Sequence, residues 1–153
     1  MNAKYVNPFL KAVEHVLGQF GIVDITKKSL QTKEDMSIES DVTAFVGVVG
    51  DIRGNVAYAF SEETAKKLAS AMMMGMPVEA LNDMTRSALA ELSNMFTGNA
   101  AAIFESEKCH LDITPPSLVV GEEVLFVLSF FQTLTVSIDT AIGTIDIHIG
   151  LEV

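Results

Sequence analysis

The polar pair best suited to chemistry in this sequence is Glu91 and Asn94, within the stretch from Thr85 to Glu105. At about 100° of rotation per residue, the stretch predicts one long helix on which side chains three residues apart are neighbours. A carboxamide both donates and accepts hydrogen bonds, so Asn94 can hold a water molecule in place, although it is not a plausible general base. The pair alone is a weak signal, because Glu-x-x-Asn arises often by chance on a solvated face.

The two sides of this predicted helix differ in composition. The side expected to face the core consists of Leu89, Leu92, Phe96, Ala100, Ile103 and Phe104. The side expected to face outward consists of Ser87, Glu91, Asn94, Gly98, Ala101 and Glu105. The residues around the polar pair are small, so another protein could approach this side of the helix closely.

Two residues on the outward side are poor choices for a helix. Asn94 is a mediocre helix former placed far from either cap, and Gly98 costs about 1 kcal/mol relative to alanine in a helix interior. Gly98 does not mark the end of the helix, because the helix formers Ala100, Ala101 and Ala102 follow it. Positions that break local rules without a visible packing gain are candidates for function.

Composition limits the classes of protein to which the chain can belong. Its 153 residues suit a single domain, 1–153, and an apolar content of 49% indicates a globular chain. The net charge of −10 argues against binding to nucleic acid or to an anionic membrane surface, because both require a basic face. The start lacks the apolar core of a signal peptide, and the longest strongly apolar run, 124–131, is too short to span a bilayer. Cys109 is the only cysteine, so no internal disulfide can form and the expected location is the cytoplasm.

Hydrophobic periodicity and turn residues predict the elements that precede the long helix. The first is a helix that ends near Gln19 and starts either at the cap Asn7-Pro8 or earlier, with a bend at Pro8. It is followed by a strand at about 22–30, a polar connection at 31–40, a strand at 42–49 buried on both faces, a turn at 50–54 and a returning strand at 55–60. A second helix then runs from the cap Ser61 to about Met74, and Asn82-Asp83 caps the long helix.

After the long helix the pattern changes to a period of two. Strands are expected at 111–114, 117–120, 123–131, 133–139 and 144–152. The last of them alternates apolar and polar residues, which is typical of a half-exposed antiparallel strand. The predicted fold class is therefore α/β in the α+β sense, with helices packed on a mainly antiparallel sheet in a single domain.

Several other motifs are better explained by structure than by chemistry. The histidines His15, His110 and His148 are scattered, so the sequence predicts no metal site, even at Cys109-His110. The glycines between 47 and 54 suit a hairpin, since no Gly-Lys-Ser/Thr follows them, and no Gly-x-Ser-x-Gly elbow of a serine hydrolase occurs. The methionines at 72–74 and 76 could form a flexible binding surface, but filling gaps in a core or a subunit contact is the favoured interpretation.

The residues Glu91-Leu92-Ser93-Asn94-Met95, followed by Gly98-Asn99, resemble the signature helix of the CheC/CheX/FliY family of chemotaxis phosphatases. Four further features resemble its CheX branch in the same order: Val6-Asn7, the hairpin at 45–60, Ser70-Ala71-Met72-Met73, and Asp112-Ile113-Thr114-Pro115-Pro116 followed by Gly121. The two prolines of the last motif lack amide donors, so they predict a stiff, extended segment. Ser93 stands where relatives often have glycine, and the single Glu-x-x-Asn pair implies one active pair per chain.

The resemblance implies a function for the outward side of the helix. The substrate would be the phosphorylated aspartate of a CheY-like response regulator, with Asn94 positioning the attacking water and Glu91 pairing with the regulator's active-site lysine. Ser87, Gly98, Ala101 and Ala102 would lie against the regulator, which would supply its own Mg2+, so the chain would need no cofactor. The resemblance also implies a homodimer formed through sheet or strand contacts. The alternatives are a non-catalytic binding module for a receiver domain or flagellar switch component, and a dimerising structural domain without a receiver partner.

Overall fold

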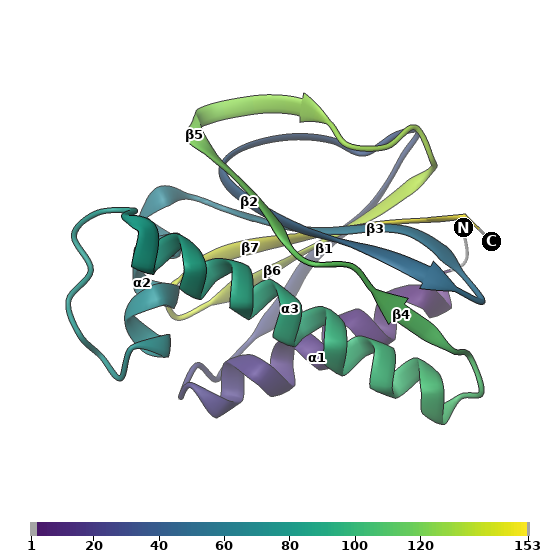
Figure 1. Cartoon of the computed structure of the whole chain (residues 1–153), viewed down its shortest axis with the longest axis horizontal. Coiled ribbons are helices and arrows are strands. Elements are labelled where there is room, and N and C mark those ends of the chain that lie inside the picture. Colours follow the sequence, from purple (N-terminus) through teal and green to yellow (C-terminus); the bar gives the residue numbers. More distant parts are fainter. Residues whose placement is uncertain (1–2, 153) are drawn as a thin grey trace.

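The computed structural model describes residues 3–152 and places three α-helices on one face of a seven-stranded sheet. Figure 1 shows α1 and α3 running along the same face of this sheet, and the two helices are in contact. Within residues 3–152, no helix has both the length and the apolar character needed to cross a membrane. In chain order the elements are η1, a short 3-10 turn (Ala3–Tyr5), α1 (Val6–Gln19), β1 (Thr26–Lys33), β2 (Ser37–Gly50), β3 (Arg53–Phe60), α2 (Glu62–Met72), α3 (Asp83–Ser106), β4 (Leu111–Ile113), β5 (Ser117–Val127), β6 (Thr133–Thr140) and β7 (Gly143–Glu152).

The long helix predicted from the sequence is α3, which has 24 residues. Asn82 caps it as predicted, because its side-chain oxygen accepts a hydrogen bond of 2.9 Å from the amide of Thr85. The side predicted to face the core does so at five positions, Leu89, Leu92, Phe96, Ala100 and Phe104. Ile103 differs from the prediction, since it is only half-buried at the edge of the core.

The sheet is antiparallel throughout its described pairs, with the order β1-β6-β7-β3-β2-β4 and with β5 also paired to β2. The β2–β3 hairpin was correctly predicted around its turn, and the predicted fold class is confirmed. Strand β2 pairs with three strands: residues 37–45 pair with β5, residues 42–48 with β3 and residues 48–50 with β4.

The predicted boundaries before β2 were wrong. The first strand is Thr26–Lys33 rather than 22–30, and β2 begins at Ser37, so most of the supposed polar connection at 31–40 is strand. All eight residues of β1 are exposed or half-buried, because it is an edge strand that pairs only with β6. Without a buried face, the strand lacks the apolar alternation from which it could have been recognised.

The two strands predicted at 117–120 and 123–131 are in fact one strand, β5. Gly121 does not separate them, because β5 stays paired with β2 on both sides of an irregularity between Ser40 and Val42. Asp41 lies at this irregularity and accepts hydrogen bonds of 3.0 Å from the amides of Glu123 and Glu62. These bonds, led by the one from Glu62, lower the pKa of the Asp41 carboxyl. The bulge thus joins β5 and α2 to β2 instead of ending the strand.

Strand β7 is not half-exposed as predicted, because both of its faces are largely covered. Met36, which directly precedes β2, and Ile38 within it form a small second core with Ala57 and Ala59 on the side of the sheet away from the helices. Figure 1 shows β5 and the start of β2 curving over this side. A Cβ atom on Gly150 would lie 2.9 Å from the Cε atom of Met36, so the glycine allows this close approach.

His148 belongs to the same covered side, where its side chain is only 4% exposed. Its Nδ1 atom lies 2.8 Å from the hydroxyl oxygen of Thr135. Burial, assisted by the nearby charge of Lys33, lowers the pKa of His148 to about 4. The imidazole is therefore neutral at physiological pH, and its environment accounts for it as a structural residue.

The start of α1 decides between two alternatives that the sequence left open, and the start of α2 confirms a prediction. Helix α1 begins at Val6, which is the earlier start, with Tyr5 as a cap that makes no side-chain hydrogen bond, so Asn7 is not the cap. Pro8 lies in the first turn, where its missing amide hydrogen is tolerated. Helix α2 begins as predicted after Ser61, whose hydroxyl oxygen accepts a hydrogen bond of 3.1 Å from the amide of Thr64.

Candidate functional site

The structure places Glu91 and Asn94 together on the outward face of α3. Glu91 is exposed and Asn94 is half-buried. Among residues 3–152, neither side chain makes a hydrogen bond or an ion pair in the folded chain. The two side chains are thus neighbours on the outward face, as the spacing predicted, and the described fold uses neither polar group.

Three other polar side chains nearby on α3 are used by the fold. Ser93 and Thr97 are buried and donate hydrogen bonds of 2.7 and 2.8 Å to the carbonyls of Ala90 and Ser93. Asn99 donates one of 2.9 Å to the carbonyl of Met95. These bonds satisfy the side chains within the helix, which distinguishes them from Glu91 and Asn94.

A buried hydrogen bond fixes α3 to the sheet behind the site. The hydroxyl oxygens of Tyr58 and Thr97 lie 2.8 Å apart. Because Thr97 donates its only hydroxyl hydrogen to Ser93, Tyr58 is the donor in this pair. Burial raises the pKa of Tyr58 far above its ordinary value, so the phenol keeps the hydrogen that it donates.

The small residues predicted for partner contact surround the polar pair. Ser87 and Ala102 are exposed, while Gly98 and Ala101 are half-buried. A Cβ atom on Gly98 would meet only the Cδ1 atom of Ile113, at 4.0 Å, which is ordinary van der Waals contact. The folded chain therefore has room for alanine at position 98 and gives no packing reason for glycine.

The segment between β4 and β5 runs beside the outward face of α3 that carries Glu91 and Asn94. The sequence alone did not predict this proximity. Thr114 exchanges two hydrogen bonds with Gly47, from its own amide to the Gly47 carbonyl at 2.9 Å and from the Gly47 amide to its hydroxyl at 2.8 Å. An open groove of about 580 Å³ separates Pro116 from Ser87 and Ala90 of α3. The Pro-Pro pair predicted a stiff segment, but only the tertiary structure shows that it runs beside α3.

The end of α3 holds a polar cluster that does not form a metal site. His110 lies between two carboxylates, with Nδ1 3.0 Å from Glu105 and Nε2 3.3 Å from Asp112. Its hydrogen bond with Glu105, and then that with Asp112, raise the pKa of the imidazole. In the described part of the chain, no group of three or more His, Cys, Asp or Glu side chains is arranged to hold a metal ion. Burial raises the pKa of the Cys109 thiol, so this cysteine is not an activated nucleophile.

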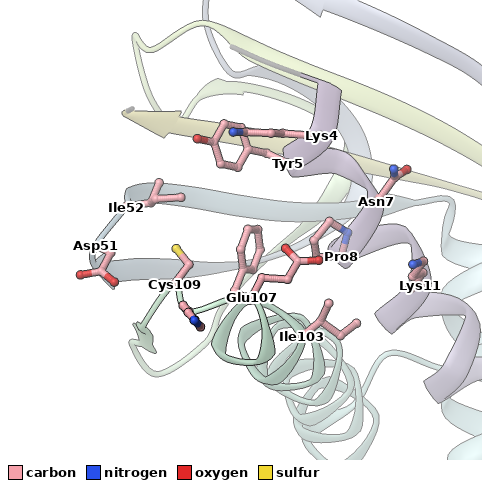
Figure 2. A pocket seen from close by; sticks show the side chains of 12 residues that line it. Lys4, Tyr5, Asn7, Pro8, Lys11, Asp51, Ile52, Ile103, Glu107 and Cys109 are labelled. Atoms are coloured by element: carbon pink, nitrogen blue, oxygen red, sulfur yellow. The ribbon is translucent and has the colours of Figure 1, made fainter.

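A separate pocket of about 540 Å³ lies at the far end of α3, between the start of α1 and the β2–β3 turn. Figure 2 shows Glu107 and Cys109 near its centre, with Lys4 and Asp51 at its margin. Phe104 in its wall lies thirteen positions after Glu91 on the helix, which is about 20 Å along the axis. The pocket is therefore distinct from the Glu91 and Asn94 face, which is an open helix surface suited to a protein partner.

Known proteins resemble this chain in sequence and in structure. The family described as chemotaxis phosphatase CheX matches residues 42–130, which include Glu91 and Asn94. The CheY-P phosphatase CheX of Thermotoga maritima is 38% identical over 125 residues, covering 81% of this chain and 80% of that protein. A CheC-like superfamily protein from a Shewanella species superposes with a TM-score of 0.88 at 25% identity, over the full length of both chains. A CheX–CheY–BeF3–Mg2+ complex from Borrelia burgdorferi contains a chain that superposes with a TM-score of 0.77 at 23% identity, covering 97% of this chain and 98% of that one.

Proposed function

Because this chain belongs to the chemotaxis phosphatase CheX family, we propose that it hydrolyses the aspartyl phosphate of a CheY-like response regulator. In this proposal Asn94 positions the attacking water and Glu91 binds the regulator's active-site lysine. The relative from Thermotoga maritima is a CheY-P phosphatase, and the complex from Borrelia burgdorferi joins a CheX to a CheY. Both support a receiver domain as the partner.

One observation carries the assignment of residues: Glu91 and Asn94 are neighbours whose polar groups have no partner among the described residues of the folded chain. The neighbouring Ser93, Thr97 and Asn99 all have partners within the helix or the sheet. A fold that needed polar side chains at positions 91 and 94 only for stability would use them in the same way. Their freedom instead suits groups that act on a second molecule.

Asn94 would act by holding a water molecule in line with the bond that breaks. The water oxygen attacks phosphorus, the bond from phosphorus to the aspartate oxygen breaks, and the aspartate leaves as a carboxylate while the water's proton passes to the phosphate product or to solvent. The Asn94 carbonyl oxygen accepts a hydrogen bond from the water, and its amide can donate to a phosphoryl oxygen. Placing the nucleophile correctly supplies much of the acceleration in phosphoryl transfer, so no strong base is needed.

Glu91 would set the position of the regulator on α3. Its carboxylate lies one helical turn before Asn94, at about 5 Å along the axis. An ion pair with a lysine ammonium in the regulator would fix the register in which Asn94 meets the phosphoryl group. Losing one partner of such a pair in a desolvated interface costs about 2–5 kcal/mol.

The proposal needs no metal ligand from this chain. The Mg2+ in the Borrelia burgdorferi complex accompanies a CheY, and we assign the divalent ion here to the regulator as well. It would neutralise charge on the phosphoryl oxygens, while Glu91 and Asn94 contribute docking and orientation. A cytoplasmic location, expected from the composition, stays a prediction.

The test is phosphate release from a panel of CheY-like regulators phosphorylated with acetyl phosphate. Asn94→Ala should lower stimulated release at least about 100-fold, because the water loses its positioning contact, while thermal unfolding stays near that of the parent. Asn99→Ala is the matched control, since Asn99 is on the same helix but is hydrogen-bonded to Met95 and lies beside α1. Parent-like activity of Asn94→Ala would rule out the positioning role.

The same assay separates hydrolysis from simple docking. A parent protein that binds a phosphorylated regulator without accelerating phosphate release would be a binding module, the main alternative. A parent protein that neither binds nor dephosphorylates any regulator would contradict the assignment of a receiver partner altogether.

We also infer a homodimer formed through the free edge of β5. In the described sheet this strand pairs only with β2, so its other edge offers unpaired backbone groups. Leu125 and Val127 on this strand are 67% and 47% exposed. Leu125→Lys should convert a dimer to a monomer in light scattering, whereas Val23→Lys, at an exposed site outside the strand, should not. A monomeric parent, or a Leu125→Lys variant that stays dimeric, would contradict this arrangement.

A further inference from the structure

Met84 is the one strongly exposed large apolar side chain within the described helix α3. It is 70% exposed, whereas Leu89, Leu92, Phe96 and Phe104 on the same helix are 1–3% exposed. Met84 is the second residue of the helix, after the cap at Asn82. The fold makes no use of its side chain, which leaves the reason for an exposed methionine open.

The position of Met84 relates it to the polar pair. It precedes Glu91 by seven residues, which is two helical turns, about 10 Å along the axis and about 20° around it. Steps of four and three residues continue the same row through Ala88, Glu91, Met95, Gly98 and Ala102. Met84 and the half-buried Met95 therefore flank Glu91 on the face that carries the proposed site.

Charge on this face narrows the kind of partner that fits it. Between Met84 and Ala102 only Arg86 and Glu91 are charged, in a chain of net charge −10. Arg86 lies about 140° around the helix from Glu91, where it lines the groove beside Ser87 and Ala90, and its Nε donates a hydrogen bond of 2.8 Å to the carbonyl of Leu81. The row from Met84 to Ala102 thus presents a single carboxylate, that of Glu91, among apolar and small residues, which is complementary to a surface with one ammonium group beside an aliphatic patch.

We propose that Met84 is an apolar anchor for the phosphorylated receiver and favours receivers that carry an aliphatic patch near the active-site lysine. The inference rests on the function proposed above and adds a specificity-determining residue to it. A flexible, polarizable methionine side chain can adapt to aliphatic surfaces of different shape, so it favours apolar contact without fixing a single geometry. Because Met84 lies two turns from Glu91, it contributes to binding and does not touch the reacting atoms.

The experiment measures phosphate release and binding for Met84→Ala and Met84→Glu across the same panel of regulators. Binding is followed separately with regulators held in the phosphorylated state by beryllofluoride and Mg2+. For the preferred regulator, Met84→Ala should raise KM and Kd about tenfold with kcat within about twofold, since it removes an interface contact that is equal in ground and transition states. Met84→Glu should weaken binding further, because it buries an unpaired charge. Met74→Ala is the control, since Met74 is 97% exposed but lies in the loop after α2.

The outcomes separate this inference from the proposed function. A parent that dephosphorylates a regulator while both Met84 variants keep its KM and Kd overturns the role of Met84 alone. A parent that binds without hydrolysis, with binding weakened by Met84→Ala, supports the anchor and overturns the proposed hydrolysis. Loss of a homodimer in Met84→Glu, with regulator binding unchanged, would show that a second copy of the chain occupies this face and would overturn the inference.

Discussion

Replacing Gly98 by alanine should stabilise the fold and impair the activity at the same time. Gly98 lies within the 24-residue helix α3, where alanine is favoured over glycine by about 1 kcal/mol. The added methyl group would sit 4.0 Å from the Cδ1 atom of Ile113, so no clash offsets the gain. For a chain of this size, about 1 kcal/mol raises the unfolding midpoint by about 2–4 °C.

The same methyl group points toward the proposed position of the regulator. If the regulator approaches α3 as closely as the small side chains allow, the alanine methyl group pushes the regulator away from the helix by about the width of a methyl. A misplacement of the reacting atoms by about 1 Å can lower the rate about 100-fold. We therefore expect Gly98→Ala to melt higher than the parent and to release phosphate about 10 to 100 times more slowly.

Calorimetry and the phosphate-release assay test both parts of this prediction. Gly18→Ala is the matched control, because Gly18 is also in a helix and a Cβ atom there would meet nothing within 4 Å. It should add stability without changing activity. A Gly98→Ala variant with parental phosphate release would refute the close approach, and one that melts lower would refute the packing argument.

Three further substitutions test other features of the structure. Glu91→Ala should weaken regulator binding by about 2 kcal/mol or more in a titration, while Glu14→Ala, an exposed glutamate on α1, should not; equal affinities would contradict the docking role. Burial lowers the pKa of His148 to about 4 in the folded chain. Between about pH 6.5 and pH 4 the histidine is therefore protonated in the unfolded chain but neutral in the folded one. Stability is lost as pH falls through this range. Urea unfolding should show that the parent loses about 2 kcal/mol more than His148→Gln between pH 7.5 and pH 5, and identical pH profiles would contradict this. Tyr58→Phe should cost about 1 kcal/mol of stability through the lost bond to Thr97, measured by urea unfolding at pH 7.5, and an unchanged free energy of unfolding would show that this bond is neutral.

Local signals in the sequence were sufficient for α2 and α3. Their apolar periodicity, the caps Ser61 and Asn82 and the glycine at 75 are all short-range features, and the predicted ends fall within two residues of those observed. The fold class followed from the same signals together with the period of two after Glu105. The placement of Glu91 and Asn94 on one outward face also follows from local geometry, because it depends only on the helical repeat.

The remaining differences arise from contacts between distant parts of the chain. Met36 covers Gly150, and this packing turns β7 from a half-exposed strand into a covered one. The bonds that Asp41 accepts let β5 continue past Gly121. The proximity of the Pro116 segment to α3 likewise depends on Thr114 and Gly47, which are far apart in sequence. The sequence pattern within a single helix or strand does not predict contacts of this kind.

The position of the site on α3 also determines how the site responds to heat. The opposite side of the same turns carries Leu92, Phe96 and Thr97, which are buried and hold the helix against the sheet. Amide hydrogens around Glu91 and Asn94 should therefore exchange with solvent only when the whole core opens, rather than through fraying of a local segment. On warming, phosphate-release activity should disappear together with the folded population, since the proposed site lies on no weaker substructure.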